Sequence, residues 1–119
     1  MLDLNTDTVR FIVERSREFQ FEEEEGEGAD VADDQPGGAN ATVRAELESA
    51  IADLEPDQQI ELVALMWLGR GDYELDEWEN AKRDAAAAYN GRTASYLIGT
   101  PLLGDYLEEG LVLHGHGEA

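Results

Sequence analysis

The chain has 119 residues, enough for one domain with a modest core, and carries 28 acidic side chains against 8 basic ones. The resulting net charge of −20 would repel phosphate backbones and anionic membrane surfaces, so we expect no nucleic-acid or membrane partner. The absence of cysteine excludes disulfides, thiolate zinc sites and a cysteine nucleophile.

The N-terminal segment, residues 1–21, is predicted to form an amphipathic helix from about Asn5 to Phe21. Its inward-facing residues recur at helical spacing near one face: Val9, Ile12, Val13, Ser16 and Phe19. Asn5 or Thr6 suits the N-cap, and the acidic Asp7 suits the first turn. Because the opening residues MLDLNTDTVRFIVERS are polar and acidic, they do not resemble a secretory signal, and we expect a cytoplasmic protein.

Residues 22–41, EEEEGEGADVADDQPGGANA, have eight acidic residues, four glycines and a proline but no basic residue. Apart from the alanines only Val31 is apolar, so the segment cannot bury enough surface to offset its ordering entropy, and we predict an acidic disordered linker. The acidity of the whole chain has three interpretations: a solvation device that includes adaptation to high salt, steering of a basic partner, or imitation of DNA. The first is favoured, because net charge acts mainly on solubility.

Residues 42–113 are predicted to form one helical domain. Its first helix carries an apolar stripe at helical spacing: Val43, Leu47, Ala50, Ile51 and Leu54. Pro56 suits the first turn of the second helix. From Ile60 to Leu68 this second helix is apolar nearly all round, which indicates burial on most sides, so we predict that this stretch is the hub of the core.

The third predicted helix runs from about Leu75 to Tyr89. Its expected inward face consists of Leu75, Trp78, Ala81, Ala85 and Tyr89. The small side chains of the tract DAAAAY would let a neighbour approach closely. Asn90 and Gly91 form a left-handed stop, and a short helical turn is expected in RTASYLI.

The last predicted helix runs from Pro101 to about Leu113, with Thr100 as its N-cap. Gly104 and Gly110 each weaken it by roughly 1 kcal/mol relative to alanine. We therefore expect these two glycines to serve close packing between helices.

The stretch WLGRGDYELDEW, from Trp67 to Trp78, raises the question of a ligand-binding loop. Aligned to a calcium-binding helix–loop–helix, it places Leu68 and Arg70 at the first ligand positions, where their side chains offer no oxygen. We favour a structural corner, in which one of its two glycines takes the positive φ that ends the hub helix. The two tryptophans would then pack across the corner.

Four side chains at the two predicted corners are candidate ligand-binding residues. Arg70 is a cation between two glycines and could hold a carboxylate or phosphate in bidentate fashion. Arg92 follows the next corner and would either pair with a nearby carboxylate or combine with Arg70 in a small anion pocket. Asp72 and Tyr96 complete the set, although Asp72 also suits a helix cap and Tyr96 suits a core.

The C-terminal residues 114–119 are predicted to form a flexible tail. His114, His116 and Glu118 could bind a transition metal loosely, but a glycine-flanked tail is a poorly preorganised site, so we expect solvated histidines and no metal. The sequence contains no phosphate-binding glycine loop and no nucleophile elbow. We therefore expect no catalytic residue and no cofactor, and we favour a protein that is not an enzyme.

Two blocks of the sequence, LVALMWLGRGD and YLIGTPLLGDYLEEG, resemble the DUF3775 family of short bacterial proteins of unknown function. The resemblance covers about Leu54 to Leu111. It implies that residues 42–113 form the recurring domain of the family, to which the N-terminal helix and the linker are peripheral. It implies no activity, cofactor or catalytic residue.

These features predict an all-α protein: a small bundle of about four helices with a tethered N-terminal helix, which either folds back on the bundle or serves a second subunit. The leading hypothesis is a small non-enzymatic interaction or regulatory module that contacts an unknown protein partner or itself, because an amphipathic helix on a tether suits helix-in-groove binding. The alternative is a small-anion or metabolite-binding protein that uses Arg70 and Arg92. A DNA mimic comes third, because eight of the 28 acidic residues lie in the linker.

Overall fold

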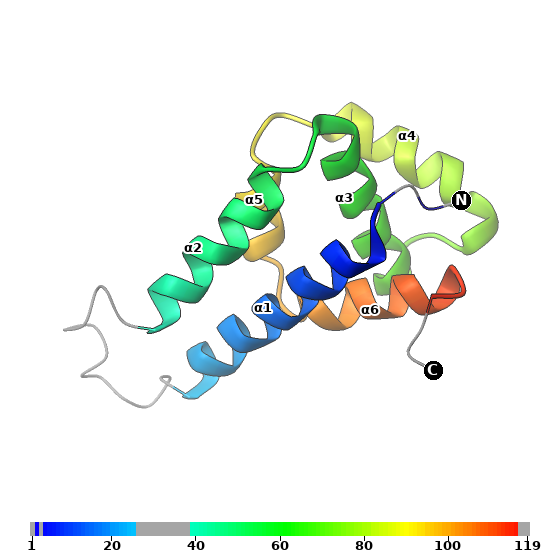
Figure 1. Ribbon diagram of the computed structural model, residues 1–119. Coiled ribbons are helices and arrows are strands. Elements are labelled where there is room, and N and C mark those ends of the chain that lie inside the picture. The colour runs from blue at the N-terminus through cyan, green and yellow to red at the C-terminus, as the bar shows by residue number, and fades with distance from the viewer. Residues whose placement is uncertain (1, 3, 26–38, 117–119) are drawn as a thin grey trace.

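The computed structural model describes residues 2, 4–25 and 39–116, and this part of the chain contains six α-helices and one short 3-10 helix (Figure 1). The elements in chain order are α1 (Thr6–Glu25), α2 (Ala39–Ala52), α3 (Pro56–Arg70), η3 (Leu75–Glu77), α4 (Trp78–Ala88), α5 (Thr93–Ile98) and α6 (Leu103–Leu113). No strand occurs among the described residues, and the predicted all-α bundle is confirmed. No helix in these residues is long and apolar enough to cross a bilayer. Most of the predicted linker, residues 26–38, lies outside the described residues.

Helix α3 lies inside the bundle, with α6, α4 and α5 packed around it (Figure 1). It begins at Pro56, as the sequence predicts, and Glu55 forms a capping box with Gln58. The residues from Leu62 to Met66 are all buried, none of them more than 8 % exposed. Five successive buried residues cannot lie on one face of a helix, so neighbours cover α3 around most of its circumference there. The predicted hub of the core is confirmed.

Helix α1 folds back onto the bundle and belongs to the hydrophobic core. It packs against α2 and α6, and its side chains of Val9, Ile12 and Val13 are buried. The buried carboxylate of Glu61 in α3 accepts a 2.7 Å hydrogen bond from the backbone N–H of Leu4, which anchors the chain just before α1 begins. The sequence left open whether this helix folds back on the bundle or serves a second subunit. In the structure it folds back on the bundle. The resemblance implied that this helix is peripheral to the domain, but in the structure its apolar side chains belong to the same core.

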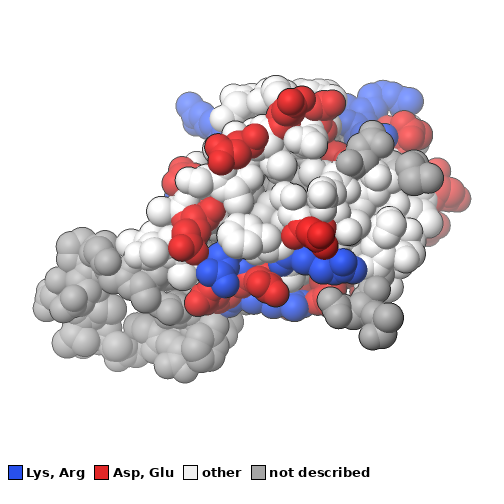
Figure 2. Space-filling model, in the orientation of Figure 1, with Lys and Arg blue, Asp and Glu red and all other residues white. Residues whose placement is uncertain are grey.

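Ion pairs join α1 to both of its neighbours. Arg15 pairs with Glu46 of α2 at 3.2 Å. Arg17 pairs with Asp105 of α6 at 3.0 Å and also with Glu108. Figure 2 shows basic and acidic side chains next to one another along the lower edge of the molecule. Because all these charges remain partly exposed, each pair contributes at most about 1 kcal/mol, and the buried apolar side chains hold α1 in place.

Three glycines let α6 approach α3 and α1 at backbone distance. A Cβ built on Gly69 of α3 would lie 1.7 Å from the backbone oxygen of Tyr106, and one on Gly110 would lie 2.7 Å from the backbone oxygen of Leu65. On another side of α6, a Cβ on Gly104 would collide with α1. Side-chain carbons do not come this close to other atoms, so only glycine fits. The predicted role of Gly104 and Gly110 in close helix packing is confirmed.

The helices on either side of the predicted linker are longer than expected. Helix α1 continues to Glu25 rather than ending near Phe21, and α2 begins at Ala39 rather than near Thr42. Glutamate has a high helix propensity, and adding residues to an existing helix needs no new nucleation. The predicted linker, residues 22–41, is therefore helical at both ends.

The third predicted helix is divided into η3 and α4. Its central residues face inward as predicted: Trp78, Ala81 and Ala85. The two outer residues do not, because Leu75 is 44 % and Tyr89 38 % exposed. A capping box between Glu74 and Glu77 forms a 3-10 turn that carries Leu75 outward, and Tyr89 has extended backbone dihedrals after the helix ends.

Helix α6 begins at Leu103, so the predicted roles of Thr100 as N-cap and Pro101 as first residue are wrong. The Thr100 hydroxyl instead donates to the carbonyl oxygen of Tyr96 at 2.9 Å and so serves the end of α5. Leu102 then turns the chain into α6 with a left-handed φ of 62°, which few non-glycine residues adopt.

Candidate functional site

The bend after α3 is a structural corner, as the sequence favours. Gly71 adopts a φ of 96°. The backbone N–H groups of Gly71 and Asp72 donate to the carbonyl oxygens of Leu68 and Trp67 at 3.1 and 3.0 Å. These bonds satisfy carbonyl groups that the end of a helix leaves open, so the glycine in this bend has an architectural role.

The Arg70 guanidinium is held by a neighbouring carboxylate. Its Nε and Nη2 atoms donate to Oδ2 of Asp72 at 2.9 and 2.6 Å. Hydrogen bonding to Asp72 raises the pKa of Arg70 above its usual value, and Tyr96 contributes to the rise. Because both charges are about 40 % exposed, at 36 % and 42 %, the pair adds well under about 1 kcal/mol to stability. It nevertheless occupies donors that a bound anion would need.

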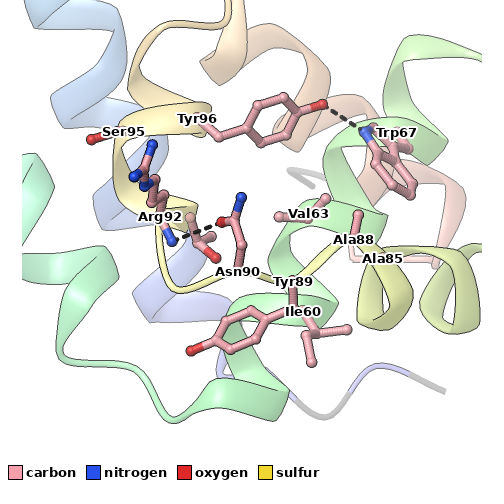
Figure 3. Close-up of a pocket in the computed structure, with 11 residues that line it drawn as sticks. Ile60, Val63, Trp67, Ala85, Ala88, Tyr89, Asn90, Arg92, Ser95 and Tyr96 are labelled. Atoms are coloured by element: carbon pink, nitrogen blue, oxygen red, sulfur yellow. Dashed lines mark hydrogen bonds between the residues drawn. The ribbon is translucent and has the colours of Figure 1, made fainter.

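An open groove with a volume of about 480 Å³ lies between α3, α4 and α5 (Figure 3). Most of its wall is apolar or aromatic and includes Ile60, Val63, Trp67, Ala88, Tyr89 and Tyr96. The α3 residues recur at helical spacing and therefore share one face of the helix. The small side chains at the end of α4, Ala85 and Ala88, leave the space open. The tract DAAAAY therefore borders a groove here.

Trp67 is fixed at the rim of this groove by two tyrosines. Its indole Nε1–H donates to the hydroxyl oxygen of Tyr96 at 2.9 Å, and its ring stacks on Tyr73 with centroids 5.9 Å apart. The Tyr73 hydroxyl in turn donates to Oδ2 of Asp84 at 2.6 Å, a bond that raises the pKa of Tyr73. This chain of contacts connects α3, the corner, α4 and α5. Trp78 does not share it: that ring packs on His114 instead, at a centroid distance of 4.4 Å.

The loop from Tyr89 to Arg92 closes the opposite end of the groove. Gly91 has a φ of 81°, and Oδ1 of Asn90 accepts a 3.0 Å hydrogen bond from the backbone N–H of Arg92. Figure 3 shows Asn90 between Arg92 on one side and Trp67 on the other. Within the described part of the chain, no carboxylate lies within ion-pair distance of the Arg92 guanidinium.

The structure divides the four candidate ligand residues into two pairs. Arg92 and Tyr96 line the groove, whereas Arg70 and Asp72 bond to each other at the corner and do not line it. The two arginines therefore lie in different surroundings. Sequence reasoning missed Ile60, Val63 and Tyr89, which it assigned to the core. The only signal for them in the sequence was the alanine tract of α4. Small side chains there are equally compatible with a closely packed neighbouring helix and with an open groove.

His114 is packed against the fold and is not a solvated tail residue. Its ring meets Trp78 edge-on, at an interplanar angle of 79°. Burial lowers the pKa of His114, and the positive charges of His116 and Lys82 lower it further. The expectation of a solvated side chain is wrong because His114 is the C-cap residue of α6 and its ring packs against Trp78. Among the described residues, no three potential ligands are grouped to hold a metal ion.

We expect the free energy of unfolding to decrease as the pH falls from about 7 to about 5 because of His114. Its pKa in the folded state is below the unfolded value of about 6.5, so the unfolded state binds more protons in this window and acid favours it. This contribution is fully present above the unfolded pKa and is lost as the pH falls through the folded one. Urea denaturation at both pH values measures it.

The variant His114→Phe keeps a ring beside Trp78 but cannot be protonated, so this part of the pH dependence should disappear. The control His116→Gln should retain it, because it changes an exposed side chain and leaves the His114 ring packed against Trp78. Identical pH dependence in His114→Phe and the wild type would contradict the assignment.

A family model described as "Protein of unknown function (DUF3775)" matches residues 44–116, more than half of the chain. The match confirms the resemblance carried by the two sequence blocks and extends it at both ends. It covers nearly all of α2 and every residue that forms the groove, and it begins after α1. No curated protein and no solved structure matches the chain.

Proposed function

We propose that this chain, which belongs to the DUF3775 family, is a non-enzymatic interaction module that binds a segment of a partner protein in the groove between α3, α4 and α5. The composition of the groove carries the proposal. Tryptophan, tyrosine and arginine are the residue types enriched at the energetic centres of protein interfaces. All three types gather here, in Trp67, Tyr89, Arg92 and Tyr96, around an apolar floor.

The rim of the groove is also preorganised for binding. Trp67 is already fixed by its hydrogen bond to Tyr96 and its stacking on Tyr73, so a partner would not have to order it. Tyr96 and Tyr89 remain 45 % and 38 % exposed, which leaves aromatic surface for a partner to cover. Each tyrosine offers an apolar ring together with a hydroxyl group that can form hydrogen bonds at the edge of an interface.

The proposed contact surface is the groove and not the N-terminal helix. The sequence suggested α1 as the contacting element because its apolar face lies on a tether. In the structure that face is buried against α2 and α6 within the same chain. We therefore keep the proposed mode of binding, in which a segment lies in a groove, but this chain provides the groove and the partner provides the segment.

A second candidate function is the binding of a small carboxylate or phosphate-bearing metabolite in the same groove. The observation in its favour is Arg92, which has no carboxylate partner among the described residues and borders a volume of about 480 Å³, within the range of natural small-molecule sites. Arg70 does not contribute, because Asp72 holds it. The largely apolar, open wall fits a polypeptide segment better, since small-molecule pockets enclose most of their ligand.

We expect Ala88→Gln to weaken peptide binding by at least about tenfold without unfolding the chain, which is a change of about 1.4 kcal/mol. Ala88 is exposed and lines the groove, so a longer side chain fills the binding space and leaves the core unchanged. Peptides would be selected from a random library displayed on phage, using the full-length chain. Their affinities would be measured by fluorescence polarisation.

The matched control is Ala87→Gln, which places the same side chain on an exposed position of α4 outside the groove lining. This variant should bind the selected peptides like the wild type. Equal binding by both glutamine variants, or a selection that enriches no peptide, would contradict the proposed function.

A further inference from the structure

Arg92 differs from three other arginines of the described chain in having no carboxylate partner there. Arg15, Arg17 and Arg70 are all paired with carboxylates. Arg92 has no such partner in the described residues, although the chain has a large excess of acidic side chains. It is also the one charged side chain among the described residues that line the groove. The positive charge at this end of the groove is therefore available to a ligand.

A carboxylate is the group that this environment would recognise. A guanidinium group forms two parallel hydrogen bonds with a carboxylate, and such charge-assisted bonds are stronger than neutral ones. Val63 and Tyr96 line the same groove, so a ligand seated against them would bring its carboxylate to the Arg92 end of a largely apolar surface. The hydrogen bond from the Arg92 N–H to Asn90 fixes the backbone from which the side chain extends.

The placement of Arg92 determines where the carboxylate of an occupant must lie relative to its apolar side chains. Figure 3 shows Arg92 and Trp67 on opposite sides of the groove, with Val63 between them. A segment that lays apolar side chains against Val63 and Trp67 would reach Arg92 within the same groove. Beyond the groove, the net charge of −20 attracts basic residues.

We propose that the occupant is an apolar segment of a partner protein with one carboxylate that pairs with Arg92 and with basic residues on its flanks. This inference rests on the proposed function and adds the chemical character of the partner segment. Local charge complementarity selects the carboxylate, and the long-range field of the chain selects the basic flanks.

The test is a parallel selection of the same displayed peptide library on three full-length chains: the wild type, Arg92→Gln and the control Arg44→Gln. Arg44 is an exposed arginine of α2 outside the groove, so both variants change the net charge equally. Peptides enriched on the wild type and on Arg44→Gln should share an aspartate or glutamate at a fixed spacing from aromatic or aliphatic residues. Those enriched on Arg92→Gln should keep the apolar residues and lose the acid.

A double-mutant cycle then measures the pairing itself. Replacing the acid of an enriched synthetic peptide by its amide should weaken binding to the wild type about tenfold and leave binding to Arg92→Gln unchanged. If the amide peptide binds the wild type equally well, the carboxylate inference is overturned, while groove binding stands as long as Ala88→Gln still blocks it.

Two other outcomes overturn the inference together with the proposed function. One is that enriched peptides bind equally to Ala88→Gln and Ala87→Gln. The other is that no peptide is enriched, while N-acetylphenylalanine raises the melting temperature of the wild type and not that of Arg92→Gln. That second result would assign the groove to small carboxylates.

Discussion

Replacing Gly69 by alanine is expected to destabilise the fold by about 3 kcal/mol or more, at the upper end of overpacking substitutions. The added Cβ would lie 1.7 Å from the backbone oxygen of Tyr106 and 2.9 Å from the backbone nitrogen of Gly110. Both are backbone atoms, so no side chain can rotate away, and α3 and α6 would have to separate. Their contact is the most extensive between any two helices in the described chain, so their separation would disrupt the core. Urea denaturation followed by circular dichroism measures the effect.

Gly99→Ala is the matched control for this substitution. Gly99 has a φ of −77°, and its added Cβ would lie 3.4 Å from the nearest atom, the backbone oxygen of Ser95. We expect this change to alter stability by only about 0.5 kcal/mol. Equal stability of the two alanine variants would show that α3 and α6 do not cross as described.

Removing residues 1–25 is expected to leave a chain that does not fold cooperatively. The deletion takes away Val9, Ile12 and Val13 and exposes the faces of α2 and α6 that they cover. Each fully buried aliphatic side chain contributes about 1.5–3 kcal/mol, so the loss approaches the whole stability of a typical domain, about 5–15 kcal/mol. Circular dichroism during thermal unfolding should show reduced helix content and no sharp transition.

Two adjacent substitutions in the full-length chain distinguish the loss of buried side chains in α1 from the effect of shortening the chain. Ile12→Ala should cost about 2–5 kcal/mol, because Ile12 is completely buried. Phe11→Ala should cost about 1 kcal/mol or less, because Phe11 is 44 % exposed and the Arg15 guanidinium lies over its ring. If the shortened chain unfolds with the same transition as the full one, α1 is not part of the core.

The elements that the sequence predicts best are those with an unambiguous period or a strong local signal. The all-round apolar stretch from Ile60 to Leu68 indicates burial whatever its neighbours are, and Pro56 marks the start of α3. The stripe of α1 is equally clear, but the same stripe would serve a neighbouring helix of the same chain or a second subunit. The start of α6 could not be predicted, because Leu102 takes a left-handed φ of 62°, a conformation that the sequence pattern does not indicate for a leucine.

The candidate site shows a similar limit. Arg92 and Tyr96 were identifiable as polar groups at a corner, and both line the groove. Ile60 and Val63 were not, because an apolar residue at helical spacing has the same pattern whether a helix covers it or it borders an open groove. The pairing of Arg70 with Asp72 could not be predicted either, because an arginine near many acidic residues can pair with one of them or bind a ligand.

The most direct measurement of binding in the groove is an NMR titration of the ¹⁵N-labelled full-length chain with an enriched peptide. The two indole N–H signals are separate reporters: Trp67 lines the groove and donates to Tyr96, whereas Trp78 is 4 % exposed beside His114. Binding in the groove predicts that the Trp67 signal shifts with added peptide while the Trp78 signal stays in place. A titration in which the peptide binds and the Trp67 signal does not move would contradict it.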